Sequence, residues 1–294
     1  MIDHKTSRHL IIIILAVFLV LIAGIAVWRL HGTGSDADEK SVLIVTDLDV
    51  GKADAAVIRY KGNTGIIDTG TDESFEHIDA FLKANDVKTI DYMILTHYHQ
   101  DHIGSAVSLL RSYPVKAVYY PDYVSEKKYY KPLMEELSGK DYAFVVDDDI
   151  SFNVGDLKID IIPASDPAPL IADEDNKDNN MCLVCRMTLG EKKLLFTADI
   201  EKDRIAQILD SDEELSADWI KTPHHGEYQK IQKDLIKRVD PEYAVISTSH
   251  EMAPDEKLID CLEEYGITYF TTMDNDVTTV CDGTLLSVNY SSQD

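Results

Sequence analysis

The hydrophobic pattern of the chain changes period several times after residue 40. Short apolar runs separated by Gly, Asp and Asn turns predict three strands, Val42–Val45, Ala55–Tyr60 and Gly65–Ile67. Helical spacing follows, because apolar residues at steps of three and four predict an amphipathic helix over Ser74–Asn85. We therefore expect an antiparallel start to a sheet, with helices packed against it.

Strands and helices alternate through the rest of the chain. Further strands are predicted at Tyr92–Thr96, Ala117–Tyr120, Ala143–Val146, Leu157–Ile162, Cys182–Leu189, Lys193–Phe196, Trp219–Lys221 and Tyr243–Thr248. Further helices are predicted at Gly104–Ser112, Glu126–Leu137, Lys202–Leu209, Gln229–Arg238 and Glu256–Tyr265. The connection Ala164–Asn180 is long, acidic and contains proline, so it is either a mobile loop or a loop near a functional site. With no repeats, residues 41–294 are expected to form one mixed α/β domain.

The first 40 residues have a different pattern. Leu10 to Trp28 carries no charge, and this length is close to the roughly 20 residues that a bilayer core requires. The run is longer than the roughly 7–15 residues of the apolar region of a cleavable signal peptide, so we expect an uncleaved anchor at 10–28, after a short cytoplasmic segment 1–9. Residues 29–40 form a flexible linker. The positive charges of Lys5 and Arg8 place the N-terminus in the cytoplasm and the remaining body outside the cell.

The acidic composition of the chain limits the kinds of molecule that it can bind. Lys and Arg number 28 against 53 Asp and Glu, a formal net charge of −25. Such a surface repels polyanions at long range and argues against tight, sequence-specific nucleic-acid binding. A solvated acidic face is the ordinary reason for such a composition.

Cys182 and Cys185 form a C-x-x-C pair, a spacing that occurs in redox and zinc sites. The pair lies in an apolar run predicted to be a strand, where residues three apart face opposite sides of the sheet. We therefore interpret both as buried, structural cysteines.

The densest group of chemically active residues is His97, His99, Asp101 and His102, directly after the strand Tyr92–Thr96. Imidazole and carboxylate are the preferred ligands of Zn²⁺ and related divalent ions. A turn after a strand can direct residues at i and i+2 to one ion and those at i+4 and i+5 to another. The spacing therefore suits a dinuclear metal centre.

This motif, with Ile-Ile-Asp-Thr-Gly at Ile66–Gly70, resembles the metallo-β-lactamase fold family. Leu194–Asp199 resembles the strand that ends in the family's metal-bridging Asp, and Lys221–Gly226 resembles its late His-His-Gly element. The resemblance runs from about Ser41 to the end of the sequence. It implies a four-layer αββα sandwich and two divalent ions as cofactors, zinc or manganese.

Within that family the elements resemble most the competence-type, ComEC-like hydrolase domains. The similar segments are Asp49–Ala55, the pair Asn179-Asn180 and His224–Glu227. The sequence departs from this pattern by Ala53 and Ala198 in place of glycines and by Cys182 and Glu227 in place of serines. No Gly-His motif lies between His102 and Asp199, so Asn179, Asn180 or a water has to replace the usual third His of the first ion.

The resemblance also implies roles for individual residues. His97 and His99 would hold one ion and Asp101 and His102 the other, with Asp199 bridging and His224 or His225 completing the second. Asp101 and Asp199 are the expected catalytic residues. Asp68 either fixes the tautomer of an imidazole from behind the centre or caps a turn. The remaining candidates, which would either support the metal ligands from behind or contact the substrate, are Asp54, Asn179 and Asn180.

The expected activity is hydrolysis of a phosphodiester, including nuclease action on extracellular DNA, because the competence-type domains are thought to act there. The acidic charge leaves open a small or cell-wall ester, such as a choline-phosphate ester, a lactone or a thioester. Five tyrosines would either hold such a cation or serve as ordinary packing: Tyr119, Tyr120, Tyr123, Tyr129 and Tyr130. A β-lactam substrate is less favoured. A non-catalytic binding or assembly module is the alternative from a different class, and metal content distinguishes it from an enzyme.

Overall fold

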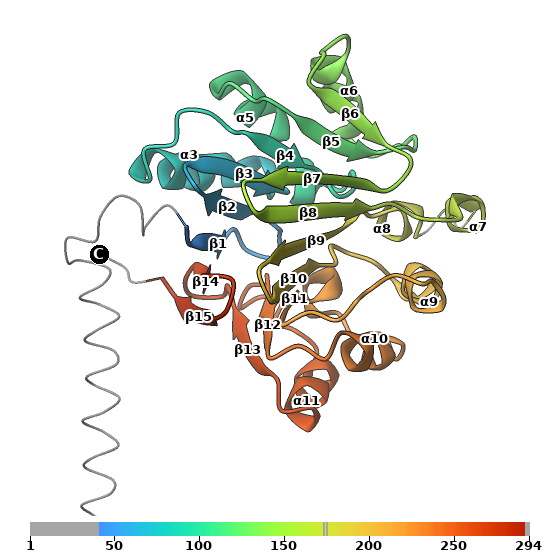
Figure 1. The fold of residues 1–294 in the computed structure, drawn as a ribbon. Coiled ribbons are helices and arrows are strands. Elements are labelled where there is room, and N and C mark those ends of the chain that lie inside the picture. Colours follow the sequence, from blue (N-terminus) through green and yellow to red (C-terminus); the bar gives the residue numbers. More distant parts are fainter. Residues whose placement is uncertain (1–40, 173, 175, 292–294) are drawn as a thin grey trace, which may run out of the picture. The chain divides into compact units, whose positions relative to one another are not determined.

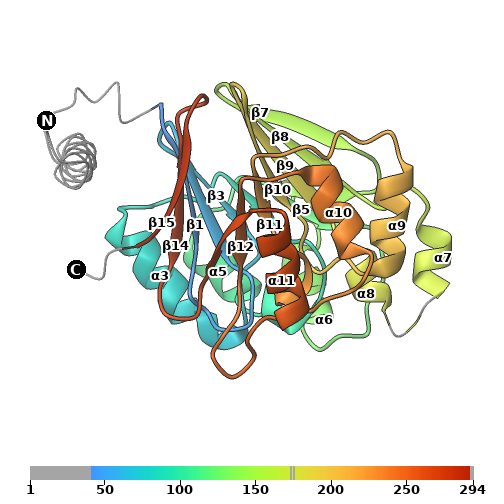
Figure 2. The same cartoon turned by 90° about the horizontal axis from the view of Figure 1, so that it is seen from below.

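The computed structural model describes residues 41–172, 174 and 176–291. Two β-sheets stack face to face, and helices cover their outer faces (Figures 1 and 2). No helix within these residues is long and apolar enough to cross a bilayer. The anchor expected at 10–28 and the linker at 29–40 lie outside the described residues.

The first sheet contains eight strands in the order β15-β14-β1-β2-β3-β4-β5-β6. Strands β1 to β3 pair antiparallel, and β3 to β6 pair parallel. The strands are β1 (Leu43–Asp47), β2 (Ala56–Tyr60), β3 (Asn63–Ile67), β4 (Tyr92–Ile94), β5 (Val118–Pro121), β6 (Ala143–Val146), β14 (Val277–Cys281) and β15 (Leu286–Tyr290).

The second sheet contains seven strands in the order β13-β12-β11-β10-β9-β8-β7. Strands β7 to β10 pair antiparallel, and β10 to β13 pair parallel. The strands are β7 (Ile150–Val154), β8 (Leu157–Ile162), β9 (Val184–Leu189), β10 (Lys192–Phe196), β11 (Trp219–Lys221), β12 (Tyr243–Ile246) and β13 (Thr268–Thr271).

Three apolar clusters explain the layers. Residues such as Ile58, Ile159 and Trp219 fill the space between the sheets. A second cluster joins the outer face of the first sheet to α3 (Phe75–Ala84), α5 (Ala106–Ser112) and α6 (Tyr130–Leu137). A third joins the second sheet to α9 (Lys202–Asp210), α10 (Gln232–Val239) and α11 (Glu256–Glu264). The expected αββα sandwich is confirmed, and side-chain alternation along the strands supplies both faces of each sheet.

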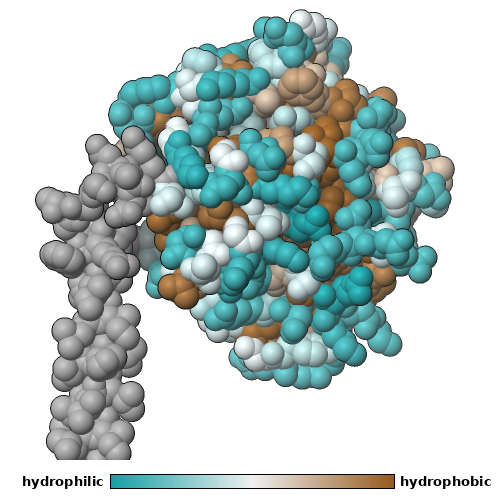
Figure 3. Space-filling view, viewed as in Figure 1, coloured by the Kyte–Doolittle hydropathy of each residue, from teal (hydrophilic) through white to brown (hydrophobic). Residues whose placement is uncertain are grey.

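The outward positions of these elements are mainly polar. The face of the molecule seen in Figure 3 is accordingly mostly hydrophilic, with smaller hydrophobic areas between. Polar side chains thus cover most of this face, as the high content of charged residues predicts.

Several element predictions need correction. The connection Ala164–Asn180 is not an unstructured loop, because it contains α7 (Pro167–Ala172) and α8 (Lys177–Asn180). Helix α6 begins at Tyr130 rather than Glu126. The prediction omitted four strands, β7, β13, β14 and β15. Strand β7 is half-exposed along its length and β14 is rich in threonine, so neither has a strong apolar pattern.

The two cysteines are buried, as expected, and free. Cys185 lies in the cluster between the sheets, whereas Cys182 lies in the cluster under α9 to α11. Burial raises the pKa of both thiols above the usual range. They are therefore structural residues on opposite faces of the second sheet.

Candidate metal centre

The candidate centre lies where chain segments leave the ends of strands from both sheets. His97 and His99 follow β4, and the short helix α4 (Gln100–Ile103) carries Asp101 and His102. The sequence predicted only a turn at this point. Asp199 follows β10, and the 3₁₀ turn η2 (Pro223–Gly226) after β11 carries the histidine pair.

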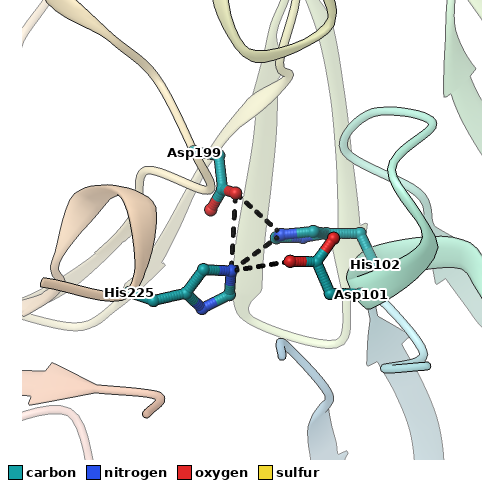
Figure 4. Close-up of side chains that lie close together, drawn as sticks. All are labelled: Asp101, His102, Asp199 and His225. Carbon is teal, nitrogen blue, oxygen red and sulfur yellow. Dashed lines mark hydrogen bonds and ion pairs between the residues drawn. The ribbon is translucent and has the colours of Figure 1, made fainter. Parts of the chain in front are cut away.

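Four of these side chains form a tight group, and Figure 4 shows them pointing toward one another. Asp199 Oδ2 lies 3.1 Å from His102 Nε2 and 3.4 Å from His225 Nε2. His225 Nε2 lies 3.4 Å from Asp101 Oδ2 and 3.3 Å from His102 Nε2. All but Asp101 are buried. Two nitrogens and two carboxylate oxygens thus converge on one point.

A second group shares Asp199. One ligand atom from each of His97, His99 and Asp199 lies within 4.8 Å of the others. His97 Nε2 is 3.9 Å from Asp199 Oδ2, and the His97 and His99 rings are 4.7 Å apart. His97 Nε2 and Asp199 Oδ1 are buried without a hydrogen-bond partner in the described structure. Asp199 therefore lies where a carboxylate that bridges two ions would have to lie.

The hydrogen bonds behind the imidazoles determine which nitrogen carries the proton. His102 Nδ1 lies 2.7 Å from Asp68 Oδ2, and His225 Nδ1 lies 3.1 Å from the carbonyl oxygen of Ser247. Both acceptors require Nδ1–H on the neutral ring, which leaves the Nε2 lone pairs facing each other and Asp199. Such lone pairs repel unless a cation lies among them. The residues present therefore fit a divalent metal ion.

Thr96 extends this arrangement to His97. Its hydroxyl donates to Asp68 Oδ2 at 2.7 Å and lies 3.1 Å from His97 Nδ1. Because the hydroxyl proton goes to Asp68, His97 Nδ1–H donates to Thr96 Oγ1. The His97 Nε2 lone pair then also faces the candidate site.

Burial and the charges of neighbouring groups together determine the pKa values of the side chains in the centre. Burial raises the pKa of Asp199, but the His102 and His225 imidazoles outweigh this effect and hold it well below the ordinary value. Burial lowers the pKa of His102, but Asp199 and Asp68 outweigh it and raise the value. Burial, aided by His102, lowers the pKa of His97. A site whose carboxylates attract protons this strongly attracts a divalent cation to the same nitrogens.

Asp54 lies behind the histidine pair and not in the tight group. It is buried, its Oδ1 accepts a hydrogen bond of 2.7 Å from Lys221 Nζ, and it lies 3.4 Å from His225 Nδ1. Burial raises the pKa of Asp54, while Lys221 and His225 lower it to a net value below the usual range. Lys221 was not among the predicted site residues. The signal was present, because a lysine that ends an apolar strand beside a histidine pair is unusual.

The two consecutive histidines have different surroundings. His225 belongs to the tight group, whereas His224 Nε2 lies 3.9 Å from Asp199 Oδ2 and its Nδ1 lies 3.5 Å from Glu201 Oε1. Glu227 Oε2 is 3.8 Å from His224 Nδ1, and Glu227 also pairs with Lys52. His224 and His225 both have positive φ, 49° and 53°. This strained backbone sends neighbouring side chains to different places.

The asparagine pair lies beside the centre. Asn179 Nδ2 donates to Glu201 Oε1 at 2.8 Å, and Asn180 Oδ1 accepts from the backbone N–H of Arg204 at 3.3 Å. Asn179 Oδ1 is buried and has no hydrogen-bond partner in the described structure. Asn180 is thus engaged with α9, and Asn179 retains a free acceptor.

Two of the five tyrosines are packing residues. Tyr123 is buried and its hydroxyl donates to Asp178 Oδ1 at 3.0 Å. Tyr119 stacks on Phe152 with ring centroids 5.2 Å apart. These contacts favour the packing interpretation over a cation-binding pocket for both.

Comparisons with known proteins agree with the geometry. The family model described as "Metallo-beta-lactamase superfamily" matches residues 48–180. ComE operon protein 3 of Bacillus subtilis (strain 168) is 27% identical over 254 residues, covering 78% of this chain but only 31% of the relative. The endoribonuclease YSH1 of Mycosarcoma maydis is 30% identical over 86 residues, covering 24% of this chain and 10% of the relative.

Solved structures share the fold. The metallo-beta-lactamase fold protein YhfI from Bacillus subtilis superimposes with a TM-score of 0.52 at 14% identity, covering 78% of this chain and 95% of that one. The expected resemblance to metallo-β-lactamase-fold proteins of the ComEC-like kind is therefore confirmed.

Proposed function

We propose that this metallo-β-lactamase-fold chain is a metal-dependent hydrolase of phosphodiesters, attached to a membrane by residues 10–28 with its catalytic body outside the cell. The convergence of the His102 and His225 Nε2 atoms on Asp199 carries the proposal, because nitrogen and carboxylate atoms that face one point suit a divalent cation. Similarity over 86 residues to a protein named as an endoribonuclease supports a phosphodiester substrate.

The two groups of side chains would hold two ions, zinc or manganese. Asp101, His102, Asp199 and His225 supply four ligands to one position. His97, His99 and Asp199 supply three to the other, and the free acceptor of Asn179 lies nearby. Nitrogen and carboxylate donors suit either metal.

When bound, divalent ions supply an activated water and neutralise charge on the phosphoryl oxygens. The protein's own groups orient this chemistry. Asp68 and the Ser247 carbonyl hold His102 and His225 in the Nδ1–H tautomer. Asp101, with a side chain 33% exposed, is the open side of the tight group, so the scissile ester approaches from there. His224, 18% exposed at the margin, is placed to donate a hydrogen bond to the leaving oxygen.

Metal analysis of the full chain, followed by hydrolysis of bis-p-nitrophenyl phosphate with Mn²⁺ or Zn²⁺, tests this function. We expect about two ions per chain and turnover that a chelator abolishes. Asp101→Ala should lower kcat at least about 100-fold with little loss of thermal stability, because the removed carboxylate is part-exposed. The matched control is Asp260→Ala, at an exposed position of α11 (Glu256–Glu264).

Other outcomes favour the other functions. Bound metal without turnover of the phosphodiester directs the search to lactones, thioesters and choline-phosphate esters. A chain that binds no metal is a binding or assembly module. An active Asp101→Ala enzyme excludes the assigned role of the tight group.

A further inference from the structure

Helices α9 and α10 lie side by side on the second sheet (Figures 1 and 2). Residues at their N-terminal ends line a cleft. Its volume is about 610 Å³, within the range of small-molecule sites. It is lined by Asn176, Glu201, Lys202, Gln229, Lys230, Ile231, Lys233 and Asp234. The cleft is thus large enough for a nucleotide-sized group.

The cleft is less acidic than the chain as a whole. Three lysines line it against two carboxylates, in a protein with a formal charge of −25. Lys233 pairs with Glu264 at 2.7 Å, but Lys202 and Lys230 are exposed and have no ion-pair partner within the described residues. One of the two carboxylates, Glu201, accepts a hydrogen bond from the side-chain amide of Asn179. Two lysines therefore remain available to a ligand.

The helices reinforce this charge. Lys202 is the first residue of α9, and the Ile231 that precedes α10 also lines the cleft. Helix N-terminal ends carry partial positive charge and attract anions. Asp203 and Asp234 in the first turns of the two helices offset part of this effect. The preference for a phosphate therefore rests on Lys202 and Lys230 together with the helix ends.

The cleft adjoins the candidate metal centre through one residue. Glu201 lines the cleft, and its Oε1 lies 3.5 Å from His224 Nδ1. His224 Nε2 in turn lies 3.9 Å from Asp199 Oδ2. The cleft and the centre are therefore neighbours, separated by the side chains of His224 and Glu201.

We propose that the α9–α10 cleft binds a second phosphate of the substrate, so that the substrate is a phosphodiester flanked by a further phosphate, as in an oligonucleotide, and not an isolated diester. This inference rests on the proposed phosphodiesterase function. It places two lysines, unpaired among the described residues, at one end of the candidate centre, in a chain whose overall charge repels polyanions.

Two thymidine dinucleotides test it: TpT, which has only the scissile phosphate, and pTpTp, which adds a phosphate at each end. One added phosphate lies toward the cleft in either binding orientation. We expect the full-length enzyme to have a kcat/KM at least about tenfold higher for pTpTp, in line with the strength of charge-assisted phosphate contacts. The double variant Lys202→Glu/Lys230→Glu should lose this preference.

The matched control is Lys140→Glu/Lys257→Glu, which makes the same change in net charge at exposed lysines outside the cleft. It should keep the preference for pTpTp. Equal hydrolysis of the two dinucleotides by the unaltered enzyme, or an equal loss of preference in both double variants, overturns the proposal.

Binding separates this inference from the proposed function. If the metal-loaded enzyme hydrolyses neither dinucleotide nor bis-p-nitrophenyl phosphate, the phosphodiesterase function fails. Calorimetric titration with thymidine 3′,5′-bisphosphate then tests phosphate binding in the cleft independently of hydrolysis. Weaker binding to Lys202→Glu/Lys230→Glu than to the control variant supports the cleft, and equal binding overturns it.

Discussion

Asp68 shows how one buried carboxylate organises the candidate centre. It accepts hydrogen bonds from the backbone and the hydroxyl of Thr96, at 2.8 and 2.7 Å, and pairs with His102 Nδ1 at 2.7 Å. The sequence left open whether it orients an imidazole or caps a turn. Its contact with His102 is the one that the orienting role requires.

Asp68→Asn removes one acceptor and should weaken metal binding at the Asp101–His102–Asp199–His225 group about 10- to 100-fold. An amide nitrogen in the place of Oδ2 donates hydrogen bonds and cannot accept one from either Thr96 or His102, so the tautomer of His102 is no longer determined. Competition against a chelator of known affinity measures the loss. Asp86→Asn, at an exposed position, is the control, and equal affinities for the two variants would contradict the orienting role.

Ala198 is a strained residue beside Asp199. Its φ is 48°, a left-handed conformation that glycine adopts without a steric cost. Ala198→Gly should therefore raise the free energy of unfolding by about 1 kcal/mol, seen as a higher midpoint in thermal unfolding. Ala206→Gly, at an exposed interior position of α9, should have the opposite effect of about 1 kcal/mol. A lower midpoint for Ala198→Gly would show that the strain is absent.

At the scale of elements, the asparagine pair connects α8 to α9. Asn180 Oδ1 accepts from the N–H of Arg204 in the first turn of α9, and α9 packs through Ile205 and Ile208 on the second sheet. Glu201 directly precedes α9, lines the cleft and lies 3.5 Å from His224 Nδ1. The position of α9 therefore determines the distance between the cleft and the histidine pair.

Asn180→Ala removes this capping acceptor and should lower the free energy of unfolding by about 1 kcal/mol. Chemical denaturation with a two-state fit measures the change. The control is Asn153→Ala on the exposed side of β7, which should change the free energy by less than about 0.5 kcal/mol. Equal effects of the two substitutions would mean that the cap contributes nothing to α9.

At the scale of the whole molecule, the described body has a complete four-layer sandwich, and the proposed anchor precedes it in sequence. We expect the full chain to sediment with membranes after an alkaline carbonate wash, and residues 41–294 alone to stay in the supernatant. External protease should degrade the body in intact cells. Sedimentation of both forms, or of neither, would contradict the anchor, and protection from protease would contradict its orientation.

Much of this protein follows from local sequence. Helix and strand periods predicted most elements, because side-chain burial repeats along each one. The candidate ligands His97, His99, Asp101 and His102 lie within six positions, so a strand end and a short helix suffice to bring them close together.

Tertiary structure decided the rest, because it depends on contacts between distant segments. The sequence could not distinguish His224 from His225, since only the left-handed backbone of both residues directs His225 to Asp199. The Lys221–Asp54 pair joins residues 167 positions apart. The α9–α10 cleft likewise forms where two helices pack on one sheet. The hydrophobic period of each helix does not predict which helix will lie beside it.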